Sequence, residues 1–162
     1  MMKKASRVKR VVVAALVLLV AIAISVPSVA VAQPKGEPFV IGYIGMVGSP
    51  GTRPCMDIQK MAVEEINATG GILGRPVKYV VMDNKGDTSL SVEALRKLVI
   101  EDKAKFVSVE GRSEICLAVQ EASGMLAKEY PHILVFNGPM GSELTARIID
   151  QAPKYDHCFR DW

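Results

Sequence analysis

Four short apolar runs recur along this chain at intervals close to one strand-helix-strand unit, and this spacing restricts the possible folds more than any other feature. The runs are Phe39–Ile44, Val77–Met82, Phe106–Val109 and Ile133–Phe136. They begin at positions 39, 77, 106 and 133, which are 38, 29 and 27 residues apart, and a strand-helix-strand unit takes about 30. Their Val, Ile and Phe content is typical of strands covered on both faces of a parallel sheet.

The segments between these runs have the periodicity of amphipathic helices. Apolar residues three or four positions apart form one helix face in each segment. They are Ile58, Met61, Ala62 and Ile66 in the first segment, Val92, Leu95 and Val99 in the second, and Ile115, Ala118, Val119, Ala122 and Leu126 in the third.

Helix boundaries and the last part of the chain agree with this alternation. Gly70-Gly71 is placed to end the first helix, because glycine readily adopts the left-handed conformation found there. Asp87 and Ser113 are placed to cap the second and third helices. A fourth helix, Ser142–Ile149, leads to an apolar segment around Cys158 and Phe159 that looks like a further strand. The predicted fold is α/β, with a mainly parallel sheet flanked by helices.

The first 32 residues have the features of a cleaved signal peptide. Five cations precede the uncharged apolar run Val11–Ile24, and a small-residue site, Ala30-Val31-Ala32, follows. We expect cleavage after Ala32, and therefore a periplasmic or secreted protein. A membrane anchor is the alternative, but this run is short against the roughly 20 residues that a spanning helix needs.

Charge gives no case for a nucleic-acid partner. The chain has 20 Lys and Arg, 17 Asp and Glu, and a formal charge of +3. Removing the five cations of residues 1–32 leaves 15 Lys and Arg against the same 17 acids, a formal charge of −2. The basic character therefore belongs to the targeting segment.

Reactive side chains give little indication of catalysis. Three cysteines leave the pairing open: Cys55 and Cys116 could meet at one sheet edge, which would leave Cys158 free. His132 and His157 are isolated, and no C-x-x-C pattern is present, so we expect no metal site and no cofactor. A secreted α/β hydrolase remains an alternative, but no G-x-S-x-G nucleophile elbow supports it.

The residues after the third and fourth runs are candidates for ligand binding, because open α/β sheets bind ligands at the carboxyl ends of their strands. Glu110-Gly111-Arg112-Ser113 leads directly into a helix. A serine beside the unpaired N–H groups of a helix start suits a carboxylate, and Arg112 could add a forked contact. The alternative is that Ser113 only caps its own helix and that Arg112 is solvated. Asn137–Gly141 forms a second loop on the same edge.

Several motifs resemble branched-chain amino-acid-type periplasmic binding proteins. Ala62–Asn67 followed by Gly70–Arg75 resembles the family's A-V-E-E-I-N-x-x-G-G-x-x-G-R signature. Weaker matches follow in the family's order. They are Asp83–Asp87, Arg96–Val99, Ser142–Thr145 and Phe159-Arg160.

The resemblance implies a non-catalytic receptor of the type I, leucine-binding-protein-like class. Such a receptor binds an amino acid or a related small carboxylate and delivers it to the membrane permease of an ABC importer. The family's ligand-binding serine carries over onto Ser113, and Gly111, Arg112, Pro139 and Met140 are the neighbouring candidates. Arg112, Pro139 and Met140 stand where small or hydroxyl residues are usual in the family. The added cation, Arg112, suggests an anionic or carboxylate-bearing ligand other than a plain branched-chain amino acid.

Length is the other departure from the family, whose members are more than twice as long. We therefore expect residues 33–162 to be the N-terminal ligand-binding lobe, truncated and without the second lobe, and to bind ligand weakly or not at all. A sensory ectodomain of the same fold is an alternative function within the same class.

Overall fold

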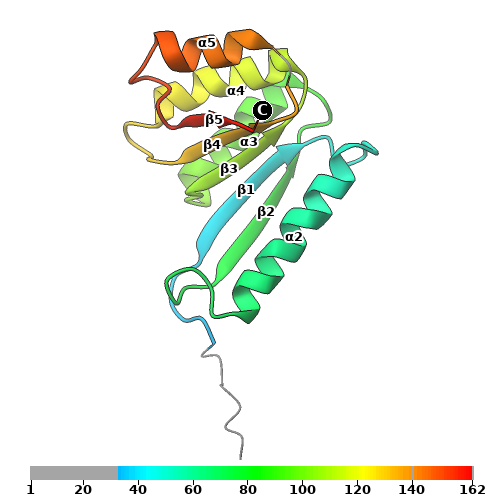
Figure 1. Ribbon diagram of the computed structural model, residues 1–162, viewed down its shortest axis with the longest axis vertical. Helices are drawn as coiled ribbons and strands as arrows, with labels where there is room; N and C mark the ends of the chain where they lie inside the picture. The colour runs from blue at the N-terminus through cyan, green and yellow to red at the C-terminus, as the bar shows by residue number, and fades with distance from the viewer. Residues whose placement is uncertain (1–32, 140, 162) are drawn as a thin grey trace, which may run out of the picture. The chain divides into compact units, whose positions relative to one another are not determined.

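Five parallel strands form the sheet of the computed structural model, which describes residues 33–139 and 141–161. The strands are β1 (Phe39–Gly45), β2 (Val77–Asp83), β3 (Phe106–Glu110), β4 (Ile133–Asn137) and β5 (Cys158–Arg160), in the order β2-β1-β3-β4-β5 (Figure 1). Each predicted run begins where a strand begins, and the segment at Cys158 is the fifth strand. The predicted fold class is confirmed.

Helices connect successive strands. They are α2 (Thr52–Ala68), α3 (Thr88–Arg96), which continues into the π-helical turn η1 (Lys97–Glu101), α4 (Ser113–Leu126) and α5 (Ser142–Asp150). Right-handed crossovers through this strand order place α2 on one face of the sheet and α3, α4 and α5 on the other. In Figure 1, α2 lies apart from the other three helices.

The hydrophobic core lies between the sheet and the group α3, α4 and α5. Leu95 and Leu98 from the second connection, Val119 from α4, and Leu134 and Phe136 from β4 are fully buried there. β1 approaches this group closely, since a Cβ on Gly42 would come within 2.7 Å of Leu98 Cδ1. A larger residue at that position of the strand would therefore displace the buried Leu98 side chain.

The face that carries α2 is covered less completely by the described residues. Ile58 and Met61 on α2 are each 66% exposed, although they belong to the predicted apolar face. Alternation along the strands turns Ile133 and Phe159 toward the same side, and they are 44% and 51% exposed. Helical periodicity therefore predicted the helix correctly, while the burial of its apolar stripe is incomplete.

The predicted helix ends are confirmed in part. Gly70 and Gly71 follow α2 with φ of +104° and +76°, and Asp87 Oδ1 accepts a hydrogen bond of 2.8 Å from Leu90 N at the start of α3. The prediction for Ser113 is wrong: Arg112 is the N-cap of α4, Ser113 is the first helical residue, and no side chain caps this helix.

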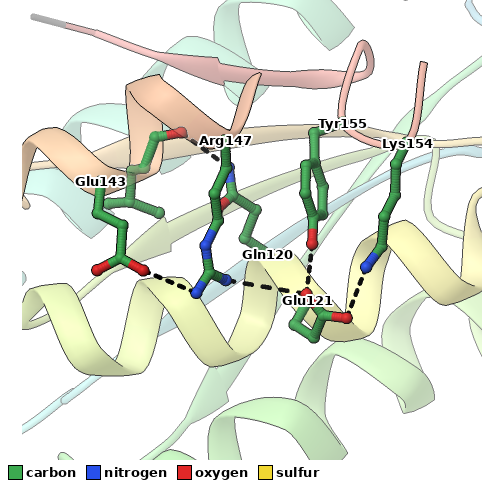
Figure 2. Close-up of polar contacts among 7 residues, drawn as sticks. Gln120, Glu121, Glu143, Arg147, Lys154 and Tyr155 are labelled. Carbon is green, nitrogen blue, oxygen red and sulfur yellow. Dashed lines mark hydrogen bonds and ion pairs between the residues drawn. The ribbon is translucent and has the colours of Figure 1, made fainter. Parts of the chain in front are cut away.

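Polar contacts fasten α5 and the segment before β5 to α4 (Figure 2). Glu121 accepts hydrogen bonds from Lys154 Nζ, at 2.6 Å, and from the hydroxyl of the buried Tyr155. Arg147 Nη1 lies 3.8 Å from the same carboxylate. Gln120 Nε2 donates to the carbonyl of Leu144 at 3.1 Å. The helix that follows the β4 loop is thus attached to α4 at several points.

Two predictions concern residues outside the described ranges: the signal peptide, residues 1–32 with its cut after Ala32, and the site residue Met140. In the part of the chain that the structure describes, no helix has the length and apolar character needed to cross a membrane.

Candidate functional site

A cavity of about 720 Å³ opens at the carboxyl ends of β1 to β4. Because the strands are parallel, the loops that follow them meet at this edge. The loop after β3 contributes Glu110, Gly111, Arg112 and Ser113, and the loop after β4 contributes Asn137, Gly138 and Pro139. Gly111, Arg112, Ser113 and Pro139, four of the five residues expected from the sequence, therefore line one cavity.

Ser113 contacts the neighbouring loop rather than its own helix. Gly141 N donates a hydrogen bond of 3.1 Å to Ser113 Oγ. The hydroxyl oxygen is thus an acceptor in this contact, and its own proton is left to donate to another group. The first N–H groups of α4 lie beside it without a side-chain cap. This arrangement offers hydrogen-bond donors and the positive end of the helix dipole to an anion.

Arg112 lines the cavity, but its charge is already paired locally. Its Nε lies 2.7 Å from Glu114 Oε1, and the two side chains are 71% and 60% exposed. Its Nη2 also donates to the carbonyl of Gly86 at 3.4 Å. An anionic ligand would therefore have to share or displace Glu114 to contact the guanidinium.

Glu110 also lines the cavity, although it was not among the five residues expected from the sequence. Thr52 Oγ1 donates to its Oε1 at 3.2 Å, and the Tyr43 hydroxyl donates to Oε2. Burial first, and then the nearby carboxylate, raise the pKa of Tyr43 above its ordinary value, so the phenol keeps its proton. The cavity thus contains a carboxylate held in place by two hydroxyl donors from β1 and α2.

Asn84, after β2, is a second residue that the sequence did not reveal. Its side chain is 1% exposed, and its Oδ1 accepts from Gly86 N at 2.9 Å. Its Nδ2 is buried and has no hydrogen-bond partner among the described residues. The neighbouring Asp83 accepts a backbone hydrogen bond from Lys85 N in the turn, and Asp87 accepts one at the start of α3, as predicted for that residue.

A second polar cluster lies at the opposite, amino-terminal edge of β4 and β5. Ser123 Oγ lies 2.8 Å from His132 Nε2 and 2.7 Å from His157 Nε2. His132 Nδ1 lies 2.7 Å from the carbonyl of Tyr130 and must donate to it, so Nε2 accepts from the Ser123 hydroxyl. The expectation that the two histidines are isolated was wrong, because Ser123 from α4 joins them.

This cluster does not have the geometry of a hydrolytic triad. Ser123 is fully buried on α4, and His157 Nδ1 lies 3.7 Å from Asp156 Oδ1, too far for a hydrogen bond. A nucleophile must reach its substrate while its base is held by a third group. The serine of this cluster is inaccessible to a substrate. The proximity of Ser123, His157 and Asp156 therefore reflects the packing of α4 beside the start of β5 and not a catalytic arrangement.

The three cysteines are unpaired. Cys55 is on α2 and Cys116 is on α4, on opposite faces of the sheet, so the suggested pairing between them is wrong. Burial raises the pKa of Cys116 and of Cys158 to about 12, which keeps both as unreactive thiols. Among the described residues, no group of three or more His, Cys, Asp or Glu side chains is arranged to hold a metal ion.

Comparison with known proteins agrees with this arrangement. A family model described as periplasmic binding protein matches residues 40–146, which include β1 except its first residue, all of β2 to β4, and all the residues that line the cavity. The chain belongs to this family. The assignment confirms the resemblance inferred from the sequence, and the family is one of solute-binding proteins.

Solved structures of substrate-binding proteins from ABC transporters have the same fold. LivJ from Streptococcus pneumoniae, a branched-chain amino acid transporter protein in complex with isoleucine, is 25% identical, with a TM-score of 0.61 over 76% of this chain and 33% of its own. A Desulfitobacterium hafniense protein in complex with Leu is 18% identical, with a TM-score of 0.60 over 76% of this chain and 34% of its own.

A third similar structure has a different kind of ligand. The solute-binding protein from Rhodopseudomonas palustris BisB5, in complex with 3,4-dihydroxybenzoic acid, is 13% identical, with a TM-score of 0.55 over 77% of this chain and 32% of its own. The periplasmic binding protein chain described here thus spans about a third of the length of these structures. No curated protein sequence matches it.

Proposed function

We propose that residues 33–162 form the N-terminal ligand-binding lobe of a periplasmic solute-binding protein of an ABC importer. The lobe binds an amino acid or another small carboxylate, and the receptor delivers it to the membrane permease. Residues 1–32 direct export and are removed after Ala32. The protein performs no chemistry on its ligand.

One observation carries the proposal: Ser113 lines the cavity at the uncapped start of α4, and its hydroxyl, which accepts from Gly141 N, retains a proton to donate. Hydroxyl and backbone donors at a helix start suit a carboxylate. The ligands of the three similar structures, isoleucine, leucine and 3,4-dihydroxybenzoic acid, all carry a carboxyl group. The shared chemistry therefore supports a carboxylate without selecting an amino acid over an aromatic acid.

The lobe contributes one wall of the site, so we expect binding in the millimolar range, about 4 kcal/mol of binding free energy. The experiment is an NMR titration of the chain from Gln33 onward with leucine and with 4-hydroxybenzoate. Each ligand is paired with its neutral amide, leucinamide and 4-hydroxybenzamide. We expect the acid of at least one pair to shift the backbone N–H signals of Gly111, Arg112 and Ser113. The neutral ligand of the same pair should bind at least about tenfold more weakly, because it cannot form the charge-assisted hydrogen bonds of the carboxylate.

Two variants test the residues. Ser113→Ala should weaken binding of the acid about tenfold, whereas the matched control Ser142→Ala, at the exposed start of α5, should leave it unchanged. Arg112→Ala should weaken it by a smaller factor, because Glu114 already pairs with this charge. Equal affinities for the acids and their amides would contradict the proposal, and equal affinities of wild type and Arg112→Ala would remove Arg112 from the site.

A further inference from the structure

Arg160, the last residue of β5, reaches back to the loop that follows β4. Its Nη1 donates to the carbonyl of Gly141 at 3.2 Å and to Thr145 Oγ1 at 3.2 Å. Its Nε is buried and has no hydrogen-bond partner among the described residues. Because a partly buried guanidinium has few hydrogen-bond partners, those partners determine its position. The position of Arg160 is therefore tied to Gly141 and to the first turn of α5.

Gly141 connects Arg160 with Ser113. Its carbonyl accepts from Arg160, and its N–H donates to Ser113 Oγ at 3.1 Å. A Cβ at this position would lie 3.0 Å from Ser113 Cβ and 3.1 Å from Oγ, so any larger residue would require Ser113 to shift by a few tenths of an ångström. The residue thus carries a polar contact on each side, one from β5 and one from the start of α4.

We propose that Arg160 is a positioning residue for the ligand site, acting on Ser113 through Gly141. By fixing the Gly141 carbonyl, it holds the Gly141 N–H on Ser113 Oγ, and the hydroxyl proton of Ser113 is turned away from this contact toward the cavity. Arg160 itself does not line the cavity. The effect on ligand affinity rests on the proposed function, whereas the effect on Gly141 does not.

The competing explanation is that Arg160 only attaches α5 to β5 through Thr145. Two substitutions separate these roles. Arg160→Lys keeps the positive charge but replaces the rigid, planar guanidinium, whose Nη1 contacts both acceptors, with a compact ammonium on a flexible stem. Thr145→Val removes the contact with α5, keeps the size of an exposed side chain, and leaves the Gly141 contact intact. Arg160→Gln is the second variant at the same position.

The first measurement is amide hydrogen exchange at Gly141, together with urea unfolding to confirm that each variant folds. We expect both Arg160 variants to speed Gly141 exchange about tenfold, the loss expected for one hydrogen bond to a charged group. Thr145→Val should leave the rate unchanged. Equal rates in wild type and both Arg160 variants, or equal acceleration by Thr145→Val, would overturn the proposal.

The second measurement is a double-mutant cycle on the affinity for leucine and 4-hydroxybenzoate. Arg160→Lys should weaken binding about threefold to tenfold when Ser113 is present and have no effect in the Ser113→Ala background, because coupled residues are not additive. Equal losses in both backgrounds would show that Arg160 does not act through Ser113. If neither ligand bound the wild-type chain, the proposed function would fail, and Gly141 exchange would still decide the role of Arg160.

Discussion

The two faces of the sheet are made by the same strands, yet their side chains have different surroundings. On the side of α3, α4 and α5, Leu98 and Phe136 are fully buried. On the side of α2, Ile58 and Met61 are each 66% exposed. The helices on both sides show the same apolar periodicity in the sequence. Periodicity therefore predicts a helix and its apolar face, but burial depends on the elements beside that helix.

The neighbours of α4 and of α2 explain the difference. α4 packs against α3 on one side and α5 on the other, so its apolar residues Ile115 and Val119 are enclosed. Among the described elements, α2 packs mainly against β2. A single helix cannot cover a sheet of five strands, because a helix with its side chains is only about 10 Å wide and strands lie about 4.8 Å apart.

The largest expected effect is on the packed side. Leu98→Ala should lower the free energy of unfolding by about 2–5 kcal/mol, because it removes contacts in a closed core and leaves a cavity. Met61→Ala on α2 is the matched control and should change stability by less than about 0.5 kcal/mol. Urea unfolding followed by circular dichroism measures both. Similar losses in the two variants would mean that the two faces do not differ as described.

The second expected effect is a loss of stability at acidic pH, and it also arises on the packed side. Burial lowers the pKa of His132 and of His157 below the ordinary value. The folded state therefore prefers the neutral imidazoles, and below the unfolded pKa of about 6.5 the unfolded chain binds more protons. The resulting stabilisation is complete above that pH and is lost as the pH falls through the lowered folded pKa values.

Unfolding curves between pH 8 and pH 5 measure this effect, with a slope of at most about 1.4 kcal/mol per pH unit for each histidine. His132→Gln with His157→Gln should flatten the curve. A slope that persists in this double variant would assign the pH dependence to other groups.

A smaller effect is expected at the contacts that attach α5 to α4. Hydrogen bonds from Lys154 and then Tyr155 lower the pKa of Glu121. Glu121→Gln should cost about 1–2 kcal/mol, mostly because the buried Tyr155 hydroxyl loses a charged acceptor, while the ionic part is screened at a half-exposed site. Glu143→Gln, which removes one exposed pair with Arg147, should cost less than about 0.5 kcal/mol. Equal losses of stability in the two variants would show that the contacts of Glu121 and Glu143 (Figure 2) are energetically equivalent surface pairs.

The smallest expected effect on stability is on the exposed side. Ile58→Lys should change the free energy of unfolding by less than about 0.5 kcal/mol, because the side chain is already in solvent. It should, however, reduce concentration-dependent self-association in sedimentation velocity, since exposed apolar patches promote association. The control Lys60→Arg, also exposed on α2, should leave both properties unchanged.

The sequence predicted the elements well because their signals are local. The apolar runs mark the starts of four strands, and Asp87 caps α3 within three residues of its partner. The candidate loops were also predicted, because parallel strands bring their carboxyl ends to one edge. Gly111, Arg112, Ser113 and Pro139 line the cavity there.

Long-range partners could not be predicted. Ser113 contacts Gly141 rather than capping its own helix, and Ser123 joins His132 with His157 because of how α4 is rotated against β4 and β5. Glu110 is bound by Tyr43 and Thr52, which are far from it in the sequence. Such pairings depend on how elements pack, and no spacing rule encodes them.

The contact between Gly141 and Ser113 has a consequence for how this protein can vary. A Cβ at 141 would come within 3.0 Å of Ser113 Cβ, so a side chain there requires the serine to move by a few tenths of an ångström. Substitutions at these two positions should therefore be inherited together, although 28 residues separate them. Related sequences that replace the glycine should also carry a compensating change at the serine. The identities of these two residues could therefore be used to classify members of the family by the shape of the loop at the ligand site.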